Sequence, residues 1–214
     1  EDRKEEVKMK LLIAVPTLDY MYFGFCESLT KLVMHLKDEG IDFDVAFRSG
    51  TLVYHAREQL AAKARIENYT HMLWLDADMI FTEDLVDDLS FHEKDFVSGI
   101  YHARRPPHVS CIFSRLMPEV ERFDRHTYPD SLFKIAGCGF GCVLMSVEVL
   151  RAVKHKFGTC FLPTLALGED LAFCDRATQC GYELWADPAT SLRHIGHVEV
   201  TAESEERYMN NLQK

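Results

Sequence analysis

Two carboxylates spaced by one residue, Asp76 and Asp78, come directly after the apolar run 71–75. This run has no polar alternation, so it predicts a buried central strand. In a chain that stays extended, residues i and i+2 point to the same side, so both carboxylates are predicted to project from the strand's C-terminal end. Ligands bind at that end in open α/β sheets. Two such carboxylates repel one another unless a cation lies between them, and Mg²⁺ or Mn²⁺ suits oxygen ligands shared with a diphosphate.

The Asp-x-Asp pair also has a plainer interpretation. By itself this pattern is common in solvated turns and at helix caps, so its position after a buried strand is what favours an ion site. A calcium loop of the EF-hand type is excluded, because Ile80 and Phe81 stand where a ligand and a glycine are needed.

More residues that could do chemistry lie in the second half of the chain. Glu169 and Asp170 follow Gly168 at the predicted start of a helix, where acids are also ordinary capping and dipole-stabilising residues. His194 follows a predicted strand, although a lone histidine is more often structural. The glycine-rich run 137–141 precedes an apolar strand, so it is neither a Rossmann fingerprint nor a P-loop. Its glycines are expected to let the backbone pass close to a ligand.

The elements that must position these residues follow an alternating order. Predicted strands cover residues 9–15, 44–47, 71–75, 96–101, 142–145, 182–186 and 190–193. Predicted helices cover residues 25–39, 55–68, 83–89 with Thr82 as N-cap, 147–155, and a last one from Gly168 to near Gly181. The opening βαβαβ series predicts an α/β fold with a mostly parallel central sheet flanked by helices. Short strands at 109–113 and 120–123 predict a small antiparallel portion.

Length and composition bound the function. A chain of 214 residues with 47% hydrophobic and 27% charged residues is sufficient for one buried domain. We interpret residues 1–8 as a charged lead-in, 9–200 as a single domain and 201–214 as a polar C-terminal helix or tail. The formal charge of -10 argues against nucleic-acid binding. No apolar run is long enough to span a membrane, and seven cysteines without a C-x-x-C pair predict reduced thiols in a cytoplasmic protein.

The ordered set of motifs resembles the GT-A glycosyltransferases, especially family 2 and its relatives, over roughly residues 10–198. The resemblance is carried by the following residues in order: Pro16-Thr17, Ala56-Arg57, Trp74-Leu75-Asp76-Ala77-Asp78, Gly137 to Gly141, Gly168-Glu169-Asp170 with Cys174 and Arg176, Gly181-Tyr182, and His194-Ile195-Gly196. It implies a Rossmann-like GT-A fold. It also implies a UDP-sugar donor (UDP-glucose or a relative), an acceptor hydroxyl on a glycan or glycoprotein, and a Mn²⁺ or Mg²⁺ cofactor. Compact domains of this kind occur in bacteria, phages and large DNA viruses, sometimes as one module of a longer multidomain enzyme, which the charged ends fit.

The resemblance also assigns roles to single residues. It implies that Asp78 binds the metal directly, that Asp76 contacts the ribose or reaches the metal through water, and that His194 completes the ligand set. The remaining donor-binding residues that it implies are Pro16 and Thr17 at the base, Arg57 at the base or phosphates, and Ala77 and Gly137 within the matching motifs. Arg48 also belongs to the implied donor-binding residues. It follows the second predicted strand, where many relatives carry an acid that makes the usual ribose or uracil contact, so this sequence departs from the family there.

Chemistry supports this assignment independently. The leaving diphosphate gains negative charge as the glycosidic bond breaks, and a divalent ion bridging its phosphates stabilises that charge. Asp170 is the predicted general base of an inverting transfer, with Glu169 beside it and the two roles open to exchange. The loop 102–108, with Arg104 and Arg105, is predicted to form the acceptor side.

Three alternatives remain at the level of sequence. A sugar nucleotidyltransferase also uses a divalent metal ion bound by acidic residues. It usually carries a glycine-rich, basic N-terminal loop, which residues 18–21 do not offer. A non-catalytic nucleotide-sugar-binding module would not need the four residues Asp76, Asp78, Asp170 and His194 together. A purely structural α/β domain leaves the clustered acids unexplained.

Overall fold

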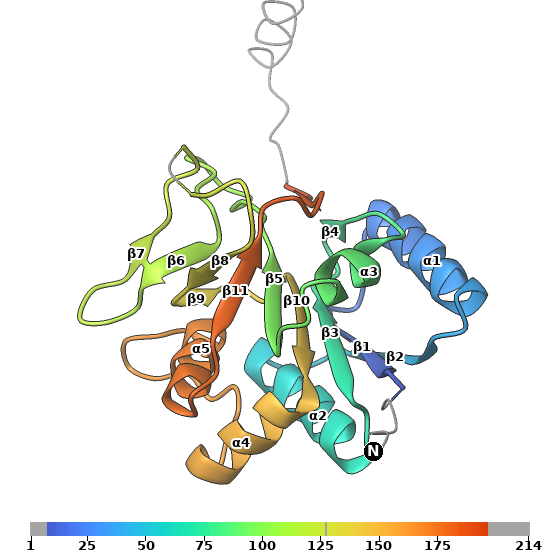
Figure 1. Cartoon of the computed structure of the whole chain (residues 1–214), viewed down its shortest axis with the longest axis horizontal. Helices are drawn as coiled ribbons and strands as arrows, with labels where there is room; N and C mark the ends of the chain where they lie inside the picture. The colour runs from blue at the N-terminus through green and yellow to red at the C-terminus, as the bar shows by residue number, and fades with distance from the viewer. Residues whose placement is uncertain (1–7, 127, 197–214) are drawn as a thin grey trace, which may run out of the picture.

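The computed structural model describes residues 8–126 and 128–196. The predicted tail at 201–214, and all of the predicted lead-in except Lys8, lie outside the described residues. A central sheet runs through the molecule with helices on both sides (Figure 1). Within the described part, no helix is long and apolar enough to cross a membrane.

The central sheet has seven strands in the order β2-β1-β3-β10-β5-β11-β8. The strands are β1 (Lys10–Pro16), β2 (Asp42–Arg48), β3 (His71–Leu75), β5 (Phe96–Gly99), β8 (Phe133–Ile135), β10 (Cys142–Ser146) and β11 (Leu184–Asp187). Strands β2, β1, β3, β5 and β11 run in one direction, while β10 and β8 pair antiparallel with their neighbours. The predicted α/β class with a mostly parallel sheet is therefore confirmed.

The helices cover the sheet in two layers. Helices α2 (Val53–Ile66), α4 (Val147–Phe157) and α5 (Glu169–Gln179) contribute to one core, and α1 (Phe23–Asp38) and α3 (Leu85–Ser90) to the other. Alternation along β1 explains the two layers: Leu12 joins the first core, whereas Leu11 and Ile13 join the second. Both faces of β1 are buried, which is why its sequence is a continuous apolar run.

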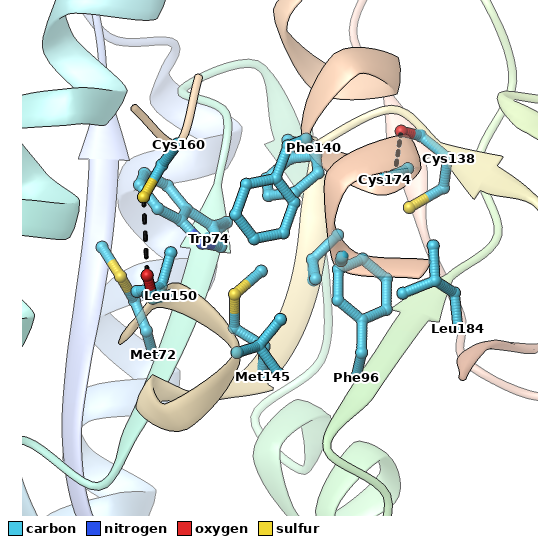
Figure 2. Packing of buried hydrophobic residues seen from close by; sticks show 14 of the residues in the cluster. Met72, Trp74, Phe96, Cys138, Phe140, Met145, Leu150, Cys160, Cys174 and Leu184 are labelled. Carbon is cyan, nitrogen blue, oxygen red and sulfur yellow. Dashed lines mark hydrogen bonds between the residues drawn. The ribbon is translucent and has the colours of Figure 1, made fainter. Parts of the chain in front are cut away.

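The larger core is built around Trp74, the indole that precedes the Asp-x-Asp pair (Figure 2). Its ring centroid lies 5.1 Å from that of Phe161 and 5.9 Å from that of Phe140, both edge to face. Two buried thiols lie in the same core: Cys160 donates to the Leu150 carbonyl and Cys174 to the Cys138 carbonyl, each with a sulfur–oxygen distance of 3.7 Å. All seven cysteines are free, in agreement with the sequence-based prediction.

Two small sheets complete the fold. β6 (Ile112–Arg115), β7 (Glu121–Arg122) and β9 (Gly137–Cys138) form a three-stranded antiparallel sheet, which confirms the predicted antiparallel portion. β4 (Met79–Ile80) pairs antiparallel with β12 (Arg193–His194). The strand predicted at 190–193 thus does not join the central sheet; only its end is extended, and it pairs beside the Asp-x-Asp segment.

One predicted cap is wrong. Thr82 does not cap the third helix, because α3 begins at Leu85 with Asp84 at its N-cap position. The buried Phe81 lies just before, and its backbone N–H donates to Ser28 Oγ of α1 at 3.2 Å. This anchor fixes the chain after β4, so the helix starts only after a turn at residues 83–84.

Candidate functional site

Asp76, Ala77 and Asp78 form a tight turn between β3 and β4. The backbone N–H of Met79 donates to the Asp76 carbonyl at 3.1 Å, which closes the turn. The prediction that the chain stays extended through the pair is therefore wrong. The turn nevertheless leaves both carboxylates at the C-terminal end of β3, close enough for Asp78 to raise the pKa of Asp76.

Each carboxylate has a partner that can carry positive charge, so the two acids are not unpaired as predicted, although Asp78 still raises the pKa of Asp76. Arg57 Nη2 lies 3.0 Å from Asp76 Oδ1. Arg104 Nη1 lies 2.7 Å from Asp78 Oδ2, and His194 Nε2 lies 3.4 Å from Asp78 Oδ1. A metal ion that binds Asp78 through both oxygens must displace Arg104.

The two acids have opposite pKa shifts. Burial raises the pKa of Asp76 to about 6, and the charge of Arg57 offsets part of that increase. Burial would also raise the pKa of Asp78, but its hydrogen bond with His194 and the nearby charge of Arg104 outweigh burial and lower that pKa. Asp78 is therefore the more strongly ionised carboxylate, which suits a direct metal ligand.

His194 reaches the Asp-x-Asp turn because β12 pairs with β4, with His194 opposite Met79. The backbone N–H of Ile195 donates to the Asp78 carbonyl at 2.8 Å and fixes this register. His194 Nδ1 lies 2.8 Å from the His102 carbonyl, which can only accept, so Nδ1 carries a proton. Burial lowers the pKa of His194, but its hydrogen bonds with Asp78 and the His102 carbonyl outweigh burial and raise that pKa. Nε2 therefore donates to Asp78 in the imidazolium form, and a metal ion at Nε2 would take the place of that proton. A backbone carbonyl holding the far ring nitrogen is the usual support of a metal-binding histidine.

The predicted metal set of Asp76, Asp78 and His194 combines carboxylate oxygens with one imidazole nitrogen, a donor set that suits Mn²⁺ or Mg²⁺. Among the described residues, the group with three ligand atoms within 4.8 Å of one another is a different one: His35, Asp84 and Asp87. That group lies on the surface, and His35 Nε2 already lies 2.6 Å from Asp87 Oδ2. It therefore gives no independent argument for an ion.

A cavity of about 240 Å³ opens beside the Asp-x-Asp turn. Five predicted site residues line it: Pro16, Thr17, Asp76, Ala77 and Asp78. Of the rest of the lining, Ala56 belongs to a motif of the resemblance and Arg104 was expected on the acceptor side, whereas five residues were not predicted from sequence: Leu18, Tyr20, Tyr22, Thr51 and Val53. Most of these residues lie in the loops that follow β1 and β2, where the irregular sequence gave no periodic signal. The two tyrosines and the apolar side chains make one wall suited to a flat, partly apolar ligand.

Two predicted donor-binding arginines do not line this cavity. Arg48 ends β2 beside Pro16, and its carbonyl accepts from the Thr17 N–H at 2.8 Å, so it shapes the adjacent loop through its backbone. Arg57 is only 3% exposed, which excludes a solvated role. Its guanidinium lies over the ring of Phe140 at 5.2 Å, behind Asp76 as seen from the cavity lining.

Arg57 connects the cavity with the start of α5. Besides its bond to Asp76, its Nη1 lies 3.8 Å from Glu169 Oε1. Nε and Nη1 have no hydrogen-bond partner within the described residues. A buried guanidinium with unused donors stabilises negative charge around it more strongly than an exposed one would.

Glu169 and Asp170 begin α5, whose N-cap position is Gly168. No side chain makes an N-cap hydrogen bond there; Asp170 Oδ1 accepts from the next N–H, that of Leu171, at 2.7 Å. Burial, and then the charge of Glu169, raise the pKa of Asp170. Asp170 therefore lies at the start of the helix without being its N-cap residue.

The glycine-rich run has a packing role. A Cβ on Gly139 would lie 2.2 Å from Tyr101 Oη, and one on Gly141 would lie 2.7 Å from Tyr101 Cζ. At these two positions the backbone passes close to a tyrosine ring, and not to a ligand as expected from the sequence. Gly137 is buried in β9, with its Cβ direction facing Leu116 and Cys174.

Three solved structures have a similar fold. A197 from STIV aligns with a TM-score of 0.59 and 19% identity, over 88% of this chain and 87% of that one. GalNAc-T7, solved with UDP, GalNAc and Mn²⁺, aligns with a TM-score of 0.57 and 12% identity, over 91% of this chain and 45% of that one. The inositol-1-phosphate CTP transferase from T. maritima aligns with a TM-score of 0.51 and 11% identity, over 92% and 94%.

No protein-family model matches the chain, and no curated protein sequence matches it significantly. This chain spans less than half of the GalNAc-T7 chain, and all three identities are low, so the likeness is one of fold. The chain has the GT-A-like α/β fold that nucleotide-sugar transferases and nucleotidyltransferases share.

Proposed function

We propose that this protein is a metal-dependent glycosyltransferase that moves a hexose or deoxyhexose from a UDP-sugar to an acceptor hydroxyl. One observation carries the proposal: His194 Nε2 is directed at Asp78 beside a cavity at the C-terminal end of β3. That combination supports the proposal, because ligands bind at this end of the sheet in open α/β folds and a metal-bound diphosphate needs such donor groups. The GalNAc-T7 structure, which contains UDP and Mn²⁺, supports the donor class.

In this proposal Asp78 and His194 hold Mn²⁺ or Mg²⁺, and Asp76 contributes through the ribose or a water. The ion supplies positive charge for the leaving diphosphate. Arg104 has a related function, because its guanidinium already neutralises Asp78. When the ion binds Asp78, Arg104 becomes available to the phosphates, for which a guanidinium is a suitable bidentate partner.

The nucleoside would occupy the part of the cavity between the loops after β1 and β2. Pro16 and Thr17 offer backbone groups there, as expected from sequence, and Tyr20 and Tyr22 add aromatic surface. The rings of these two tyrosines lie 6.1 Å apart, edge to face. A uracil can pack against such a surface while its polar edge bonds the backbone.

Asp170 is the proposed general base of an inverting transfer, with Glu169 as its rival. Its raised pKa strengthens it as a base, since a carboxylate with a higher pKa accepts a proton more readily. Glu169 is the acid that pairs with Arg57, so it is better suited to hold that side chain in place. The two acids thus divide into a base and a positioning residue.

The test is Asp170→Asn, with Glu169→Gln as the matched variant. Removing a positioned base should lower turnover by about 10²–10⁴-fold while donor binding survives. A capping role predicts near-normal turnover, because Asn caps almost as well as Asp. If Glu169→Gln abolishes turnover and Asp170→Asn does not, the roles are exchanged.

A sugar nucleotidyltransferase is the second candidate, favoured by the similarity to the T. maritima CTP transferase along most of both chains. The two activities release different products. A glycosyltransferase releases UDP from a UDP-sugar, whereas a nucleotidyltransferase releases pyrophosphate from a nucleoside triphosphate. Assaying both products with Mn²⁺ discriminates between them, and release of neither, together with tight UDP binding, would indicate a non-catalytic binding module.

A further inference from the structure

A second, larger cavity of about 640 Å³ is lined in part by the loop 102–110. Its size is that of a small-molecule site. It is lined by three histidines and two arginines with a single acid: His102, His108, His126, Arg122, Arg125 and Asp124, together with Pro107, Val109, Ser110 and Phe123. In a chain with a formal charge of -10, such a concentration of basic groups is a local exception.

This basic pocket adjoins the proposed donor site through a single residue. The ring of His102 belongs to the pocket lining, while its backbone carbonyl accepts from His194 Nδ1 at 2.8 Å. The loop is held closed by a bridge between His102 and Ser110 and by the Ala103 N–H, which donates to the Val109 carbonyl at 2.9 Å. The same loop sends Arg104 to Asp78, so it contributes residues to both cavities.

The sequence analysis expected Arg104 and Arg105 on the acceptor side. Arg104 instead lines the donor cavity, and neither arginine lines the basic pocket. The basic groups of that pocket come from both ends of the loop, from Arg122 of β7 and from the segment that follows β7. A sequence cannot show this, because the two segments meet only through the small antiparallel sheet.

The basic side chains are held in different ways. Arg122 is fixed, since its Nη1 donates to the Ser110 carbonyl at 2.7 Å and its guanidinium lies over the Phe113 ring at 4.4 Å. Arg125 is exposed. Asp124 is the single acid of the lining, and its Oδ1 accepts from the His126 N–H at 2.9 Å. His102 Nε2 is buried without a hydrogen-bond partner among the described residues, so the pocket wall carries an unused polar atom.

We infer that the basic pocket is the acceptor subsite and that it takes a sugar bearing an anionic group, a phosphate or a carboxylate. This inference rests on the proposed transferase function. A neutral glycan would gain little from two arginines, whereas an anion forms charge-assisted hydrogen bonds with them. Because the net charge of the chain is negative, the basic pocket also favours the approach of an anionic acceptor to this part of the surface. Nucleic acid needs an extended basic face, whereas these basic side chains gather around one cavity.

The experiment uses glucose 6-phosphate, glucuronic acid and glucose as probes, titrated by calorimetry into the protein with saturating UDP and Mn²⁺. The variants are Arg125→Gln and, as a matched control, Arg115→Gln. Arg115 is another exposed arginine of the same antiparallel region, pairs with Glu121 and does not line the pocket. Either anionic sugar should bind at least about tenfold more tightly than glucose, and Arg125→Gln should weaken that binding about tenfold while Arg115→Gln leaves it unchanged.

The two anionic probes distinguish phosphate from carboxylate recognition. Equal binding of glucose and both anions, or equal loss in the two variants, would overturn the inference. UDP affinity is measured in parallel and should be the same in all three proteins. Absence of UDP binding in the wild type would contradict the proposed function, whereas an anion preference sensitive to Arg125 would still establish the basic pocket as an anion site.

Discussion

Among the described residues, Asp78 pairs with two side chains that can carry positive charge, Arg104 and His194. The effect of removing it therefore depends on which interaction dominates. Repulsion from Asp76 alone would predict a gain in stability, as the sequence suggests. The ion pairs instead predict a loss of stability, because truncating Asp78 leaves a histidine and an arginine without their acceptor.

Asp78→Ala should lower the free energy of unfolding by about 1 kcal/mol and abolish metal-dependent UDP binding. The small cost reflects the exposure of Arg104, whose side chain is 48% accessible. Thermal unfolding with and without UDP and Mn²⁺ measures both effects. Asp38→Ala, an exposed acid at the end of α1, is the control and should behave as the wild type. A wild-type response to UDP and Mn²⁺ in Asp78→Ala would place the metal elsewhere.

Asp76 predicts a pH dependence with a defined sign. Its pKa in the folded state is about 6, against an ordinary value of 3.8, so in that window the folded state keeps a proton that the unfolded state loses. Stability contributed by Asp76 therefore falls as pH rises from about 4 to 6. Unfolding by urea across this range should show a shallower fall for Asp76→Asn than for the wild type. Equal slopes would rule out the raised pKa.

At the level of elements, Tyr101, just after β5, packs against Gly139 and Gly141, which precede β10. Tyr101 is buried, its Oη accepts from the Gly141 N–H at 3.0 Å, and Gly139 leaves no room for a side chain beside that oxygen. This packing holds the segment whose Gly141 carbonyl accepts from the Asp76 N–H. The glycine run thus supports the Asp-x-Asp turn from behind.

Gly139→Ala should cost about 1–3 kcal/mol, because its methyl group would overlap Tyr101 Oη. Combining it with Tyr101→Phe removes the clashing oxygen, so the double variant should lose less stability than the sum of the two single changes. Chemical denaturation of the four proteins gives the coupling. Strict additivity would show that the ring moves aside without cost.

Many of the elements could be predicted from sequence because their apolar patterns are strong. The strand 71–75 matches β3, and the other predicted helices and strands of the main sheet fall within a few residues of their observed ends, but the short β8 was not predicted. The antiparallel direction of β10 could not be predicted, since a continuous apolar strand reads the same in either direction. The pairing of β12 with β4 could not be predicted from the sequence either, because each strand contributes only two residues.

The candidate site could be predicted only in part. Asp76 and Asp78 follow an unmistakable strand, so their place at its end was predictable. The partners of Arg57 and Arg104 were not, since a single cation in a helix or loop carries no periodic pattern. These contacts depend on segments that the tertiary fold brings together.

For the whole molecule, donor and metal should bind as one unit. At concentrations about 100-fold above the dissociation constant, a ligand specific for the folded state stabilises it by ~2.7 kcal/mol. UDP with Mn²⁺ should therefore raise the melting temperature by roughly 5–10 °C. UDP with excess EDTA should raise it little, because Asp76 and Asp78 would then face the phosphates directly. The same increase with and without EDTA would separate nucleotide binding from metal binding.

The contact between His102 and His194 also matters for the chain as a polymer. The two residues are separated by 92 positions, and closing a loop of this length has an entropic cost that grows only with the logarithm of its length. A ligand that touches both Asp78 and His194 holds the loop shut without adding a covalent bond. In the proposed function, the bound donor would therefore link the middle of the described chain with its end reversibly. Occupancy of the site would stabilise the folded state in addition to serving the reaction.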